Sequence, residues 1–90
     1  MSLMQQVSAL ARMLFLHRKK HGQWITQRML YEYALRAFDC NEARAKKAIN
    51  LGVEMGFFVD HVSHLQLSLK GYELIEEKPL AEEPTLEEFK

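Results

Sequence analysis

Residues 39–58, with the sequence DCNEARAKKAINLGVEMGFF, decide the fold. Their apolar side chains recur at spacings of three and four, the period of one helix face: Ala45, Ala48, Ile49 and Val53. Asp39 followed three residues later by Glu42 resembles a capping box, which predicts a helix start near Cys40. Gly56 suits a helix end. The stretch therefore predicts a helix from Cys40 to Met55 that runs into an apolar strand.

Two further amphipathic helices precede this stretch. Residues 3–20 carry apolar side chains at helical spacing and end in a cationic run before Gly22, which predicts a helix closed by a glycine. After a very short apolar run at residues 23–25, Thr26 is placed to cap a second helix. Five positions of that helix are expected to face the core: Met29, Leu30, Tyr33, Ala34 and Ala37. Only about two to four residues join the second helix to the third, which is typical of a helix-turn-helix.

Beyond Gly56 the pattern changes from helical to strand-like. Apolar runs at residues 57–59 and 65–67 flank a polar break, which predicts a β-hairpin. Ser68 is then placed to cap a last short helix that ends at Glu76 or Glu77. The predicted fold class is mainly α with a small β-hairpin (α+β), in the order α-β-α-α-β-β-α, as one domain over residues 1–77.

The ninety residues suffice for one domain and exclude a two-domain enzyme. Hydrophobic residues make up 48% of the chain and charged residues 27%, values typical of a protein that folds around a core. The single Cys40 excludes an internal disulfide and fits a reducing compartment. No apolar run approaches the roughly 18–20 residues of a membrane span, and the amino terminus lacks the charge order of a secretory signal. We therefore expect a cytoplasmic protein.

The net charge of zero conceals two halves of opposite sign. Residues 1–70 hold ten Lys and Arg against five Asp and Glu, a net charge of +5, and residues 71–90 hold two against seven, a net charge of −5. Two prolines interrupt the acidic part, which predicts a disordered tail over residues 78–90. This tail is a solubilising end, a competitor for the basic face, or a protein-binding motif. A basic body with an acidic appendage indicates a polyanion-binding domain, although a charge run is commonly only a solvated face.

Two stretches about a dozen residues apart carry a family resemblance. Residues 45–58, AKKAINLGVEMGFF, contain a cationic helix that runs into a glycine and an apolar strand, and residues 67–75, LSLKGYELI, contain a strand, a hydroxyl cap and a short helix. Both resemble the winged helix-turn-helix family of DNA-binding domains, over roughly residues 4–76. Gly52 stands where that family usually has a large aliphatic residue, and Leu51 where it has an exposed polar one. The resemblance implies that helix 41–55 is the recognition helix and that the ligand is double-stranded DNA.

The resemblance and the charges together predict the side chains that contact DNA. Lys and Arg neutralise phosphates and reach guanine acceptors, Asn pairs with adenine, and a helix amino terminus offers free backbone donors. The expected contacts are Arg44, Lys46, Lys47 and Asn50 on helix 41–55, Gln27 and Arg28 at the start of the second helix, and His61 and His64 at the hairpin tip. The hairpin contacts are opposed by Asp60, and a short polar turn that touches nothing is an equal alternative.

Metal binding and catalysis are not expected. His17 and His21 have the four-residue spacing that places two imidazoles on one metal, but Gly22 ends the helix next to them and other ligands are distant in sequence. Cys40 lacks a positioned base, and a chain this short offers little substrate cleft. The sequence thus predicts no enzyme, no metal and no cofactor.

Helix 3–20 has more apolar surface than one core face uses. Ala9, Met13 and Leu16 lie roughly opposite the stripe expected to face the core, which predicts a homodimer interface. The function that we expect is a small transcriptional regulator that binds duplex DNA. The alternative is a winged-helix protein interaction module, an adaptor or complex subunit, which the cation-poor hairpin and Leu51 favour. If the acidic tail is a protein-binding motif, it adds a further protein partner.

Overall fold

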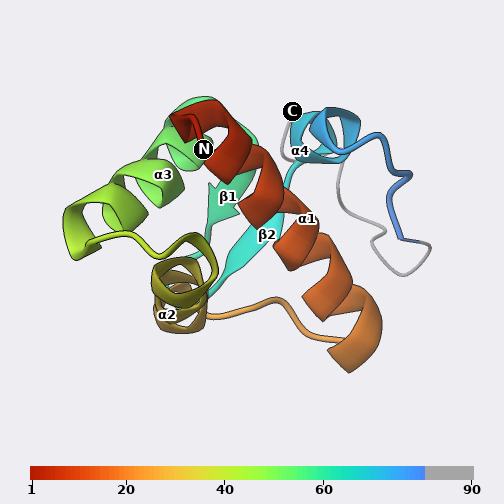
Figure 1. Cartoon of the computed structure of the whole chain (residues 1–90). Coiled ribbons are helices and arrows are strands. Elements are labelled where there is room, and N and C mark those ends of the chain that lie inside the picture. Colours follow the sequence, from red (N-terminus) through yellow and green to blue (C-terminus); the bar gives the residue numbers. More distant parts are fainter. Residues whose placement is uncertain (81–90) are drawn as a thin grey trace.

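Four helices and one hairpin follow one another along residues 1–80, the part of the chain that the computed structural model describes. The helices are α1 (Leu3–His21), α2 (Gln27–Phe38), α3 (Glu42–Glu54) and α4 (Leu69–Leu74), and the hairpin pairs β1 (Phe58–Asp60) with β2 (Leu65–Leu67). The protein is mainly helical with a two-stranded antiparallel sheet, which confirms the α+β class. α1 crosses the molecule, with α2 and α3 to one side, α4 to the other and the hairpin behind it (Figure 1).

α1 is the central element of the core. It contacts α2, α3, α4 and β2, and its buried face carries Val7, Leu10, Ala11, Leu14 and Phe15. On its outer side the Arg12 guanidinium donates to the Ile75 carbonyl oxygen at 2.9 Å and lies 3.5 Å from the Glu77 carboxylate. These bonds tie the amino-terminal helix to the end of α4.

The turn between α2 and α3 is three residues long, Asp39 to Asn41, as the sequence predicted, but its caps differ from the prediction. Asn41 caps α3, because its side-chain oxygen accepts from the Arg44 backbone N–H at 2.9 Å. Asp39 instead ends α2 in the left-handed conformation, with φ 48° and ψ 48°. Asp tolerates that region better than most residues, so the prediction of a cap at Asp39 and a start at Cys40 was wrong.

The buried face of α2 is rotated from the predicted one. Leu30 and Ala34 are buried as expected, whereas Met29 is 48% exposed and Ala37 is exposed; Tyr33 is half-buried. The flanking side chains that do pack against the core are Tyr31, Leu35 and Phe38. Two apolar stripes overlap on this helix, and the core takes Leu30 and Ala34 with parts of both beside them.

α3 packs closely on β1 through a glycine. A Cβ atom at Gly52 would lie 2.2 Å from Cε2 of Phe58, whose side chain is 2% exposed. The ring of Phe58 thus occupies the space that a large side chain at position 52 would need. Ala45, Ala48 and Ile49 complete the buried face of α3, and Val53 is only half-buried.

The predicted strand before α2 is reduced to one rung of pairing with the hairpin. It makes one isolated bridge, between Thr26 and His64, and the Ile25 carbonyl accepts from the Leu65 N–H at 3.0 Å. Ser68 caps α4 as predicted, since its hydroxyl accepts from the Gly71 N–H at 3.0 Å, but the helix ends earlier, at Leu74.

The described chain continues past the predicted domain boundary at residue 77. Leu80 is half-buried and packs against the core. Residues 81–90, which make up most of the predicted acidic tail, lie outside the described residues. Within residues 1–80, no helix combines the length and hydropathy required to cross a membrane.

Candidate nucleic-acid interface

The exposed side of α3 carries Lys46, Lys47 and Asn50, which we call the α3 ridge, and Glu54 lies exposed on the same face at the end of the helix. The ridge side chains lie opposite the buried face, because the helical period separates positions 46, 47 and 50 from positions 45, 48, 49 and 52. Within residues 1–80 the side chains of Lys47 and Asn50 have no hydrogen-bond or ion-pair partner. The Lys46 ammonium lies 5.8 Å from the centre of the Tyr31 ring, a cation–π distance.

Arg44 does not share this exposed face. It is half-buried, its Nε donates to Oε1 of Gln6 at 2.8 Å, and its Nη2 lies 3.3 Å from the Met1 carbonyl oxygen. The guanidinium therefore joins α3 to the start of α1. Of the four side chains that the sequence predicted for DNA contact on this helix, the structure brings three together on the ridge.

A hollow of about 310 Å³ separates the α3 ridge from the start of α2. We call it the α2–α3 hollow; its lining consists of Gln27, Arg28, Tyr31, Lys46, Ile49 and Asn50. Four of these six residues were predicted from the sequence as DNA contacts. Tyr31 and Ile49 were missed, although Tyr31 lies one helical turn after Gln27 and its position follows from that spacing.

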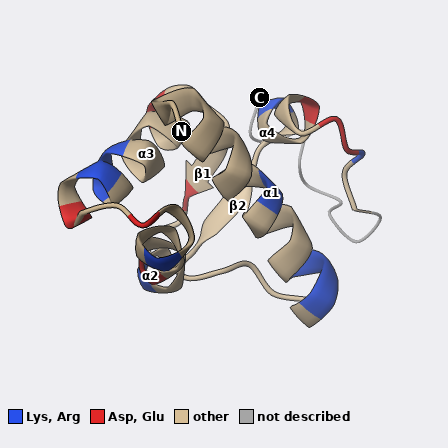
Figure 2. Ribbon diagram, in the orientation of Figure 1, with Lys and Arg blue, Asp and Glu red and all other residues tan. Residues whose placement is uncertain are grey.

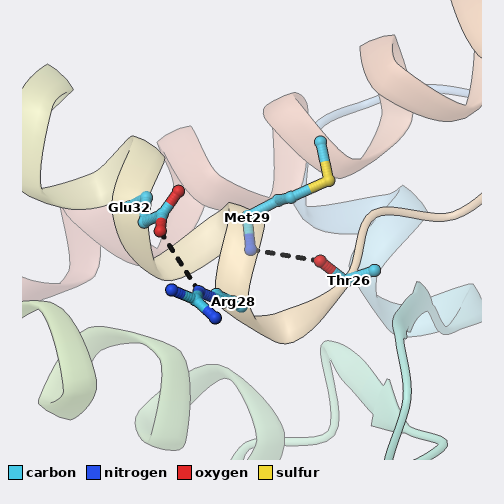
Figure 3. Close-up of polar contacts among 4 residues, drawn as sticks. All are labelled: Thr26, Arg28, Met29 and Glu32. Carbon is cyan, nitrogen blue, oxygen red and sulfur yellow. Dashed lines mark hydrogen bonds and ion pairs between the residues drawn. The ribbon is translucent and has the colours of Figure 1, made fainter.

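The start of α2 presents backbone donors and one cation to this hollow. The Thr26 hydroxyl accepts from the Met29 N–H at 3.1 Å, which leaves the first-turn N–H groups before it without intrahelical partners (Figure 3). Arg28 pairs with Glu32 one turn later at 3.3 Å, as Figure 3 also shows. Their side chains are 88% and 52% exposed, so the pair contributes only about 0.3–0.5 kcal/mol to stability. An incoming anion can therefore replace Glu32 as the partner of Arg28 at small cost.

Tyr31 has a perturbed acidity. Burial raises the pKa of its hydroxyl, and the negative charge of Glu42 and a hydrogen bond with that side chain raise the pKa further, with a small contribution from Cys40. The hydroxyl therefore stays protonated at neutral pH. The Tyr31 ring, which lies at a cation–π distance from the Lys46 ammonium, is thus part of the lining of the hollow.

The hairpin tip is joined to α2. Asp60 accepts from Nε2 of Gln27 at 2.6 Å and from the Val62 N–H at 2.7 Å. The rings of His61 and His64 stack with centroids 4.7 Å apart, and Nε2 of His61 lies 3.0 Å from the Gln66 side-chain oxygen. The side-chain amide of Gln27 is thus bound to the hairpin. The two histidines lie close in sequence to the Asp60 carboxylate, and residues 48–69 contain no Lys or Arg.

The cations do not form one continuous patch. Figure 2 shows one basic group along α3 and another at the last turn of α1, at opposite ends of the view, with basic segments on α2 between them. The described body spans 36 × 23 × 22 Å, so the end of α1 is distant from the α3 ridge. The cations of α3 and of the start of α2 thus form a group separate from those at the end of α1.

The predicted dimer residues line a second hollow, of about 260 Å³, between α1 and α2. We call it the α1–α2 hollow, and its lining consists of Ala9, Arg12, Met13, Leu16, Tyr33, Ala37 and Phe38. Leu16 is 48% exposed. The structure therefore gathers Ala9, Met13 and Leu16 on one apolar surface and adds three residues of α2 to it.

The chain also holds one cysteine and four histidines. The Cys40 thiol is half-buried and lies 3.8 Å from the Ala34 carbonyl oxygen. Within residues 1–80, no three or more His, Cys, Asp or Glu side chains are arranged to hold a metal ion.

Comparisons of the chain with protein-family models, with curated proteins and with solved structures gave no significant match.

Proposed function

We propose that this protein is a winged helix-turn-helix domain that binds duplex DNA with α3 in the major groove and acts as a transcriptional regulator without chemistry of its own. The observation that carries the proposal is the α3 ridge. Lys46, Lys47 and Asn50 lie exposed on the second helix of a helix-turn-helix pair, beside a hollow whose far wall is the start of the first. This arrangement fits a helix that enters a groove while its partner helix lies against the backbone.

The side chains on this surface contact different parts of the DNA in this proposal. Lys47 neutralises a phosphate. The side-chain oxygen and the NH₂ group of Asn50 are both available for an adenine edge. Arg28 leaves its weak pair with Glu32 to bind a phosphate, which the first-turn N–H groups of α2 also contact. The hairpin, which carries Asp60, His61 and His64, contributes shape rather than positive charge.

The domain acts as a homodimer in this proposal, paired through the α1–α2 hollow. Exposed apolar side chains from two helices gather there, whereas scattered single ones are ordinary on a protein surface. Pairing doubles the number of α3 ridges and supports a core that is small for lack of chain length. Replacement of Leu16 by Glu is expected to yield a monomer in sedimentation analysis without loss of the fold.

A duplex titration at 50 and 200 mM salt tests the proposal. Three cations, Arg28, Lys46 and Lys47, lie on the surface of one domain, so the logarithmic salt slope is expected near about −2.7 and the affinity is expected to fall about 40-fold over this range. For a dimer with six such contacts the expected fall is about 2,000-fold. The titration therefore also reports the stoichiometry of the bound form.

Two matched lysine variants locate the contact. Lys47→Ala is expected to reduce the magnitude of the salt slope by about one, whereas Lys20→Ala, the same charge change on the last turn of α1, is expected to leave it unchanged. Absence of binding at 50 mM salt, both for the full chain and for a chain that ends at residue 80, would refute the proposal.

A protein interaction module is the second candidate function. Three features favour it. The side chains of Arg44 and Gln27 are bound to other parts of the protein, the hairpin has no Lys or Arg, and the α1–α2 hollow is apolar. Under this alternative, Lys47→Ala and Asn50→Ala leave DNA affinity unchanged and weaken binding to a protein partner.

A further inference from the structure

The last turn of α1 brings two imidazole rings together. The ring centroids of His17 and His21 are 4.6 Å apart, and the ring planes are inclined at 45°. The helix remains regular through His21, and Gly22 caps it in the left-handed conformation, with its N–H donating to the Arg18 carbonyl at 2.9 Å. The four-residue spacing is therefore held by a complete helical turn, which removes the objection that Gly22 ends the helix too early.

The tautomer of the neutral His17 ring follows from its hydrogen bond. Its Nδ1 lies 3.0 Å from the Gln23 carbonyl oxygen, which can only accept, so Nδ1 carries the proton when the ring is neutral. Nε2 then presents its lone pair away from that bond. A ring nitrogen that donates to a backbone carbonyl while the other faces outward is the arrangement found in metal-binding histidines, because the bond fixes both tautomer and ring orientation.

We propose that His17 and His21 bind one divalent transition-metal ion of the imidazole-preferring class, Cu²⁺, Ni²⁺ or Zn²⁺, and that water completes its coordination. Imidazole nitrogen suits these ions and suits Mg²⁺ or Ca²⁺ poorly. The site has two protein ligands, since no group of three or more candidate ligands exists within residues 1–80. It is independent of DNA binding, and its place at the end of α1 is remote from the α3 ridge.

Neighbouring charges do not exclude a cation here. The Arg18 guanidinium lies 5.7 Å from the centre of the Trp24 ring and donates to the Gly22 carbonyl, and the Lys19 ammonium lies 5.8 Å from the Phe15 ring. The repulsion from exposed lysines acts through solvent, whose high dielectric constant weakens the interaction between exposed charges. The free carbonyl groups at the carboxyl end of the helix favour positive charge.

The bound ion would link positions 17 and 21 across the last turn of α1. An ion held only by the folded helix stabilises the native state according to its concentration. At about ten times its dissociation constant it is expected to raise the Tm by about 5–10 °C for a domain of this size.

Calorimetric titration of the untagged full chain with NiCl₂ at pH 7.5, with thermal unfolding at each metal concentration, tests the site. One ion per chain is expected to bind, and MgCl₂ is expected to change nothing. His17→Gln and His21→Gln are each expected to weaken nickel binding by about tenfold or more, since even loss of a group that only orients a ligand costs about that much. The matched control replaces both His61 and His64 by Gln, which removes the other close imidazole pair and is expected to leave nickel binding intact.

Amide NMR spectra with substoichiometric Cu²⁺ locate the ion independently of stability. Paramagnetic broadening confined to residues 14–24 supports the site, whereas broadening centred on residues 60–66 or on Cys40 overturns it. Unchanged nickel affinity in His21→Gln, with the metal-free Tm also unchanged, equally overturns it.

Discussion

Gly52→Ala provides the sharpest test of how closely α3 packs against β1. An alanine in the middle of a helix is normally more favourable than a glycine, by about 0.8–1 kcal/mol. At this position, however, the new methyl group would lie 2.2 Å, 2.5 Å and 2.8 Å from three atoms of the Phe58 ring. Because that ring is 2% exposed, it has no open space into which to turn. The packing around the glycine thus reverses the usual sign of the substitution.

The size of the effect follows from two opposing contributions. Overpacking a core costs about 1–3 kcal/mol, and the helix preference for alanine returns about 0.8–1 kcal/mol. The net loss of unfolding free energy is therefore about 0–2 kcal/mol, equivalent to a fall in Tm of up to about 15 °C. Gly71→Ala is the comparison variant, since its methyl would lie 2.3 Å from the Phe57 backbone oxygen, which cannot rotate away, and a larger loss is expected.

Urea unfolding followed by circular dichroism measures both variants, and a double-mutant cycle with Phe58→Leu assigns the cause. The smaller side chain relieves the overlap, so Gly52→Ala is expected to cost less in the Phe58→Leu background, with a coupling of about 0.5–3 kcal/mol. A stabilising Gly52→Ala substitution, or additive effects in the cycle, would refute the close packing of α3 on β1 and with it the outward direction of the α3 ridge.

Four further substitutions or deletions have expected outcomes. Arg44→Met is expected to cost about 1.5–3 kcal/mol of stability, because it breaks charged hydrogen bonds to α1, and to change the salt slope of DNA binding less than Lys47→Ala does. Ile49→Ala is expected to cost about 2–5 kcal/mol in chemical denaturation through a core cavity. Ser68→Ala removes the α4 cap and is expected to lower stability by about 0.5–2 kcal/mol, whereas a value near zero in the same assay would contradict the capping role. Deletion of residues 81–90, which carry a net charge of −3, is expected to strengthen nonspecific DNA binding in an anisotropy titration; equal or weaker binding counts against a tail that competes with DNA.

The pattern of apolar residues was sufficient to find the four helices and the hairpin, but it could not orient α2 or place every cap. On α2 the stripe of Met29, Tyr33 and Ala37 and the stripe of Tyr31 and Leu35 are both apolar, so the period alone does not choose between them. The choice depends on where α1 and α3 lie. Similarly, Asp39 and Asn41 can both cap a helix, and only the left-handed turn at Asp39 decides which one does.

The candidate site was predictable in its residue types and less so in its contacts. Spacing placed Lys46, Lys47 and Asn50 off the apolar stripe, and the structure exposes all three. The same reasoning placed Arg44 there, because a sequence pattern does not reveal that Gln6, 38 positions away, lies within hydrogen-bond distance. The commitment of Gln27 to Asp60 was hidden for the same reason, since it bridges 33 positions.

The position of α1 at the centre of the core has a consequence for biosynthesis. This helix leaves the ribosome before the rest of the fold, yet its buried face is covered by β2 and α4, which are translated last among the described elements. A nascent chain that ends near residue 60 would therefore carry a helix whose contacts with β2 and α4 are not yet formed. Such chains are exposed to aggregation until the final helix emerges, so folding of this domain during translation is expected to depend on protection of α1 by the ribosome exit region or by a chaperone.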